Sequence, residues 1–144
     1  MHRKVAAAII AALALAVASC GGSETTTLDR AELIRKVELA CKAAGQTTER
    51  QTRAEGSANP YKALGSGQRL LAARLEKLDG SGDLKDAFNR YKEGVRTRLD
   101  ALEKVASAPR QDRARVLRTV QKEAVAAGRQ IGAAVEKLGL EGCG

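Results

Sequence analysis

Residues 83–109 of this chain, DLKDAFNRYKEGVRTRLDALEKVASAP, decide its fold class. Apolar residues recur in this stretch at steps of three and four, which places them on one face of an α-helix. Asp83 is a suitable N-cap with Asp86 behind it, and Ala108-Pro109 is predicted to end the helix. We predict one long amphipathic helix whose apolar face consists of Leu84, Phe88, Tyr91, Val95, Leu99, Leu102 and Ala106.

The segment that follows Asp29 predicts an earlier helix. Asp29 is a suitable cap, with Glu32 as its reciprocal partner three residues on. Two ends are compatible with the sequence: Gly45, or Gly56 if the proline-free segment between them continues the helix. The apolar face is predicted to consist of Leu33, Ile34, Val37, Ala40, Cys41 and Ala44.

Two more helices complete the pattern. Asn59-Pro60 is a typical helix start, and the Asp-Gly-Ser-Gly sequence of residues 79–82 ends that helix. The fourth helix is predicted to begin near Arg110, to be the longest, and to end at Gly139 in a left-handed cap. The apolar faces are predicted to be Tyr61, Leu64, Gln68, Leu71, Leu75 and Leu78 in the second helix, and Leu117, Val120, Ala124, Ala127, Ile131, Val135 and Leu138 in the fourth.

Four amphipathic segments joined by short breaks predict an all-α fold, an antiparallel four-helix bundle. The chain has no Trp, one Phe and two Tyr, so Leu, Val, Ile and Ala must supply the core. These residues fill helix interfaces well. The length is that of one domain.

The N-terminus has the three parts of a secretory signal. Arg3 and Lys4 precede an apolar run over residues 5–18, which is too short to span a bilayer. The run ends in Val17-Ala18-Ser19-Cys20, which resembles the lipobox of bacterial lipoprotein precursors. That resemblance implies a diacylglyceryl group on the Cys20 thiol, cleavage before Cys20, and possible acylation of the new amino terminus.

The predicted organisation is therefore a signal peptide over 1–19, a flexible tether over 20–27 and a helical bundle domain over 28–144. The predicted location is outside the cytoplasm, with the chain anchored to the bacterial cell membrane through lipid on Cys20. The alternatives are an ordinary cleaved secretory signal, with Cys20 nearby by accident, and an uncleaved helix.

Export favours a disulfide between the two remaining cysteines, Cys41 and Cys143. Two buried thiols, or pairing of Cys143 with another chain, are the alternatives. A bridge requires the segment after Gly139 to leave the fourth helix and return along the first one to Cys41 in mid-helix. This requirement favours a first helix that continues beyond Gly45.

Nearly the whole chain resembles small, uncharacterised actinobacterial lipoproteins. The likeness rests on the lipobox, residues 30–34 with Cys41, residues 75–78, and the terminal residues 138–144. It implies an exported helical bundle with one bridge, and it transfers no catalytic or binding residues.

The residues required for common enzyme chemistry are scarce. His2 is the only histidine and lies in the predicted signal peptide, so no imidazole remains for a metal, haem or general base. A serine–lysine dyad with Lys62 or Lys104 is conceivable, but no motif supports it. The Gly-Ser-Gly sequences at 65–67 and 80–82 lack the strand and the Gly-Lys-Ser ending of a phosphate loop. We predict a non-enzyme without cofactor or metal.

Positive charge is the remaining functional lead. Removing Arg3 and Lys4 from 25 basic residues leaves 23, against 17 acidic residues, which gives a mature net charge of +6. A candidate face for anionic lipid or wall polymer consists of Arg113, Arg115, Arg118 and Lys122. The alternative is ordinary solvating charge on a surface helix. Nucleic acid is not expected, because few aromatic residues are present to stack on bases.

Gly128 and Gly132 allow two interpretations, a self-association face or close packing within the bundle against Phe88 or Tyr91, and the second favours a monomer.

The predicted function is non-catalytic binding or a structural role at the cell envelope, with an envelope protein or an anionic polymer as the possible partner. A cationic binding module and a bundle that holds a small apolar ligand are the alternatives.

Overall fold

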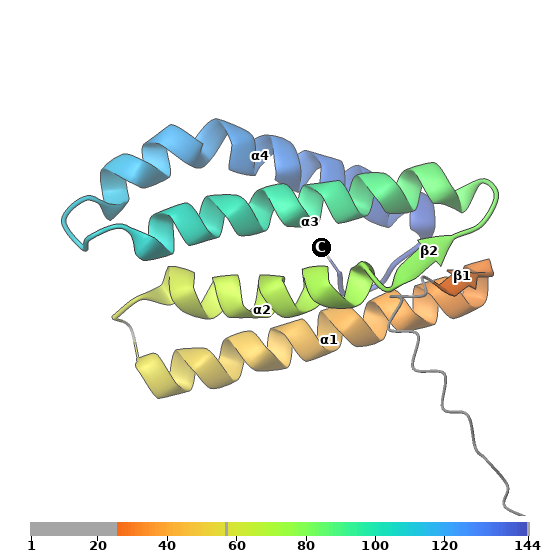
Figure 1. Ribbon diagram of the computed structural model, residues 1–144, viewed down its shortest axis with the longest axis horizontal. Helices are drawn as coiled ribbons and strands as arrows, with labels where there is room; N and C mark the ends of the chain where they lie inside the picture. The colour runs from red at the N-terminus through yellow and green to blue at the C-terminus, as the bar shows by residue number, and fades with distance from the viewer. Residues whose placement is uncertain (1–25, 57, 144) are drawn as a thin grey trace, which may run out of the picture.

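The computed structural model describes residues 26–56 and 58–143, and four helices make up most of this part of the chain. They are α1 (Arg30–Glu55), α2 (Pro60–Leu75), α3 (Leu84–Ser107) and α4 (Arg113–Leu138). The helices lie side by side in the order α1, α2, α3, α4 (Figure 1). The mostly helical fold with four helices is confirmed. The predicted signal peptide, Cys20 and most of the predicted tether lie outside the described residues.

Several helix ends lie at the predicted caps, and others differ. A side-chain oxygen of Asp29 accepts a hydrogen bond from the Glu32 amide at 2.9 Å, and α1 continues past Gly45 to Glu55. Asp83, by contrast, makes no side-chain capping bond, so its predicted role is wrong. The fourth helix begins at Arg113, after a turn over residues 109–112, and is as long as α1, at 26 residues each.

Two short strands pair at one end of the molecule, which we call the strand end. Strands β1 (Thr26–Leu28) and β2 (Leu78–Gly80) are parallel, with Thr26 opposite Leu78 and Leu28 opposite Gly80. Leu28 and Leu78 are buried here. The predicted extension of helix two to Leu78 is wrong, because α2 ends at Leu75 and Leu78 begins β2. Thr26 and Thr27, at the end of the predicted tether, belong to β1. Burial of two leucines, together with backbone pairing, orders a segment whose composition is typical of a linker.

The core is larger at the strand end than at the opposite end. All four helices contribute to the larger cluster, in which Phe88 and Tyr91 of α3 are completely buried. The smaller cluster contains Ala101, Val105 and Val120, packed against Tyr61 of α2 and two partly buried residues of α4. No residue of α1 belongs to this smaller cluster.

Two glycines let helices pack closely. A Cβ atom added to Gly67 of α2 would lie 2.7 Å from the Ala44 carbonyl oxygen of α1, and one added to Gly94 of α3 would lie 2.8 Å from the Ile131 side chain of α4. The pairs α1–α2 and α3–α4 therefore depend on positions without a side chain. The predicted packing role of Gly128 and Gly132 is wrong, because both are exposed and no atom lies within 4 Å of a Cβ built there.

The chain returns to α1 after α4, as predicted. Gly139 has a positive φ of 72°, and its amide donates to the Val135 carbonyl at 2.9 Å. The following Leu140 is buried, and the Glu141 amide donates to a carboxylate oxygen of Glu38 at 3.0 Å. These contacts lay residues 139–143, the C-terminal tail, along the middle of α1.

Candidate functional site

The C-terminal tail brings the two predicted partner cysteines together. The sulfur atoms of Cys41 and Cys143 are 2.14 Å apart, which is bonding distance. The hydroxyl of Tyr91 lies 3.3 Å from the Cys41 sulfur and can donate to it. Cys20, the predicted lipid anchor, lies outside the described residues.

Tyr91 sits in the centre of the larger core cluster. Burial raises the pKa of its phenol to about 12, and the positive charge of Arg98 opposes this rise. The neutral phenol is thus the form that fits this interior at physiological pH. It acts as a packing residue with one polar contact.

The structure divides the predicted cationic face. Arg113 is half-buried and its guanidinium donates to the carbonyl oxygens of Ala108 and Ala58, at 3.2 and 3.1 Å. Arg115 pairs at 3.0 Å with Asp112, the residue that precedes α4. Arg113 thus links the two connections, between α1 and α2 and between α3 and α4. It lies about 140° around α4 from Arg118, so the two residues are not on the same face of the helix.

Arg118 and Lys122 do share a face, and Arg129 extends it. These three cations make no ion pair with any residue that the structure describes, and they line an open groove of about 510 Å³ together with Gln121, Val125 and Ala126. Val125, which also lines this groove, is 49% exposed. We call Arg118, Lys122, Val125 and Arg129 the α4 stripe.

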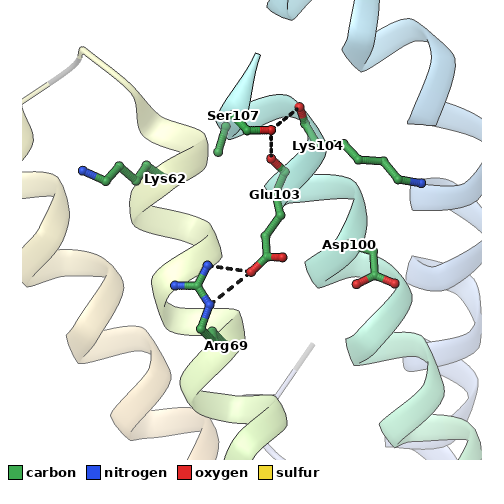
Figure 2. Close-up of a pocket in the computed structure, with 7 residues that line it drawn as sticks. Lys62, Arg69, Asp100, Glu103, Lys104 and Ser107 are labelled. Atoms are coloured by element: carbon green, nitrogen blue, oxygen red, sulfur yellow. Dashed lines mark hydrogen bonds and ion pairs between the residues drawn. The ribbon is translucent and has the colours of Figure 1, made fainter. Parts of the chain in front are cut away.

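A depression of about 700 Å³ lies between α2 and α3 (Figure 2). It is broad and open, and its charged groups are mostly paired. Arg69 donates two hydrogen bonds to one carboxylate oxygen of Glu103, at 3.1 and 2.6 Å, and Lys104 pairs with Glu123 of α4.

The same depression holds Ser107, whose hydroxyl donates to the Glu103 and Lys104 carbonyls of its own helix. Figure 2 shows the Lys62 and Lys104 amines pointing away from this hydroxyl in opposite directions. Lys62 pairs instead with Glu55 of α1 at 2.8 Å. The predicted candidate lysines are thus not placed to activate Ser107.

A smaller cavity of about 190 Å³ lies beside the cysteine pair. Its walls come from α1, α2, α3 and the tail, and its polar groups include Thr48, Gln68 and Arg98. Arg98 also borders an apolar pocket of about 110 Å³ lined by Tyr61, Leu117 and other residues of α3 and α4. Sequence reasoning missed this pair of cavities, although Gln68 on an otherwise apolar helix face was a signal.

The residues that the structure describes contain no cluster of three or more His, Cys, Asp or Glu side chains suited to a metal ion. Within the same ranges, each helix is too short or too polar to cross a membrane.

Comparison with protein-family models, with curated proteins and with solved structures gave no match. A functional interpretation therefore depends on the residues themselves.

Proposed function

We propose that this protein is a lipid-anchored, extracytoplasmic helical bundle with a non-catalytic binding role at the cell envelope. The observation that carries the proposal is the Val17-Ala18-Ser19-Cys20 sequence after a basic start and a short apolar run. In the proposed mature protein, residues 1–19 are removed and Cys20 carries the lipid. The resemblance to actinobacterial lipoproteins is part of this proposal.

The cysteine pair supports export. Two cysteines 102 residues apart are held at bonding distance by a buried leucine and a backbone hydrogen bond of the tail. Disulfides of this kind persist in oxidising compartments and are rare in the cytosol. A stable Cys41–Cys143 bond is thus what an envelope location predicts.

The proposed mature fold is an antiparallel bundle. At the end opposite the strands, Asn59 donates to the Ala106 carbonyl and Arg113 donates to the Ala58 carbonyl. At the strand end, Ser81 donates to the Leu28 carbonyl and Arg30 pairs with Asp83. Short connections between successive helices at alternating ends support an up-and-down path.

Intact mass of the protein purified from its native membrane tests the anchor. We expect a chain that starts at Cys20 and carries added acyl mass, with a deficit of two protons that reductant removes. A Cys20→Ala variant should lose the acyl mass and keep the proton deficit. An unacylated chain cut at another position would overturn the anchor.

A second candidate function is a module that binds anionic lipid or wall polymer through the α4 stripe. The observation that favours it is that three cations, Arg118, Lys122 and Arg129, line one groove on α4 and have no carboxylate partner among the described residues. Attraction to an anionic surface weakens as salt shortens the Debye length. Binding to anionic vesicles at low and at high salt tests this candidate.

A further inference from the structure

The cavity beside the cysteine pair contains an acceptor without a donor. The side-chain oxygen Oε1 of Gln68 is buried and has no hydrogen-bond partner among the described residues. Most buried polar atoms in folded proteins are hydrogen-bonded, and an unpaired one is unfavourable. A bound group that donates a hydrogen bond to Oε1 would remove this cost.

The same cavity contains a cation without an anion. Arg98 is half-buried, and its guanidinium makes no hydrogen bond or ion pair with any residue that the structure describes. Its neighbours in the cavity wall include Thr48 and Gln68 but no acidic residue. A guanidinium has five donors in a planar arrangement that matches a carboxylate.

Arg98 lines both this polar cavity and the apolar pocket. The pocket walls are formed by Tyr61 of α2, Leu102 and Val105 of α3, and Leu117 and Val120 of α4. Leu117 is 38% exposed, so the pocket opens to the surface on this side. An elongated ligand that spans both cavities would place its polar end at Arg98 and a short aliphatic chain against Leu117 and Val120.

We propose that these two cavities, which share Arg98 in their walls, connect beside its side chain and together bind a short aliphatic carboxylate that carries a hydrogen-bond donor next to its carboxyl group, such as a 2-hydroxy acid. The carboxylate accepts from Arg98, the neighbouring hydroxyl donates to Gln68 Oε1, and the aliphatic chain occupies the apolar pocket. The absence of an acidic wall residue favours a neutral donor over an ammonium group. This inference rests on the proposed binding role and names its ligand class.

Titration of the full chain with 2-hydroxyhexanoate, followed by NMR shifts of arginine side-chain N–H groups, tests the proposal. The short probe stays in water rather than in the detergent around the N-terminal segment. We expect saturable binding that is weaker for hexanoate, which lacks the donor, and for 2-hydroxyhexanamide, which lacks the charge. Arg98→Gln should weaken binding on the order of tenfold.

Arg96→Gln is the matched control, because it removes the same charge from the same helix. Arg96 pairs with Glu76 outside the cavities, so this variant should bind as the parent does. Leu117→Gln should weaken binding through the apolar pocket and is tolerated at a partly exposed position. Equal binding of the acid and the amide, equal loss in both arginine variants, or no saturable binding would overturn the proposal.

The two proposals fail separately. A chain that lacks acyl mass at Cys20 but binds 2-hydroxyhexanoate would overturn the anchor and retain the ligand class. An acylated chain that binds none of the three probes would retain the anchor and overturn the ligand class.

Discussion

The Cα atoms of Cys41 and Cys143 lie 5.5 Å apart, although 102 residues separate them along the chain. A bond between them closes nearly the whole described fold into one loop. In the chain-entropy model, such a loop contributes about 5 kcal/mol to stability. We expect Cys143→Ser to lower the free energy of unfolding by about this amount in urea titrations. Reductant should have the same effect on the parent and no effect on the variant; a parent insensitive to reductant would contradict the bond.

Gly67 and Gly65 form a matched pair on α2. Gly67→Ala should destabilise the protein by about 1–3 kcal/mol, because the new Cβ would overlap Thr48 and crowd the Ala44 carbonyl of α1. Gly65→Ala meets no atom within 4 Å and should stabilise the helix by up to about 1 kcal/mol. Thermal unfolding of both variants checks whether the two stability changes have opposite signs. Equal effects would argue against the close α1–α2 contact.

Tyr91 predicts a loss of stability at alkaline pH. Burial raises its pKa to about 12, above the ordinary phenol value of 10.0. The unfolded chain therefore loses the phenol proton first, and stability falls as pH rises from about 10 to about 12. The free energy of unfolding should fall by about 2–3 kcal/mol over this pH range. Tyr91→Phe keeps the ring and should lose this part of the pH dependence, as measured by unfolding at several pH values; an unchanged profile would exclude Tyr91 as its source.

Arg113 should matter for stability rather than for binding. Its guanidinium holds the carbonyls of Ala108 and Ala58, so Arg113→Ala should cost about 1–2 kcal/mol in thermal or urea unfolding. Arg115→Ala removes only an exposed pair with Asp112 and should change stability by less than about 0.5 kcal/mol. Similar losses in both variants would contradict the structural role of Arg113.

Neutralising the α4 stripe tests the second candidate function. A basic residue near an anionic membrane contributes about 1 kcal/mol, so changing Arg118, Lys122 and Arg129 to Gln should reduce the preference for anionic over neutral vesicles by about 100-fold. The control changes Arg53, Arg69 and Arg96 to Gln, which removes the same charge from paired positions. An equal loss in the control would indicate net charge rather than the stripe.

Local signals in the sequence predicted the helices well. Asp29, Asn59 and Gly139 act at helix ends as predicted, because capping depends on residues within one turn of each other. The return of the tail was predictable because a disulfide imposes a distance. β1 and β2 were missed, since three-residue strands have no usable periodicity and their pairing joins residues about 50 positions apart.

The candidate sites depended on packing that the sequence does not display. Arg113 and Arg118 look equivalent in the sequence, yet one supports the connections between helices and the other is on an open face. Gly128 and Gly132 have the spacing of a packing motif but face open space, whereas Gly67 and Gly94 make the close contacts. Arg98 carried no signal, because its lack of an acidic partner depends on which helices surround it.

The covalent loop closed by Cys41 and Cys143 also affects how the protein responds to proteases. The turn between α3 and α4 exposes Arg110, a cleavage site for trypsin-like enzymes. Because Arg110 lies between the two cysteines, a cut after it adds one water and leaves both fragments joined by the bond. A nicked molecule can therefore keep its packed helices, and only cleavage combined with reduction would separate the two pieces.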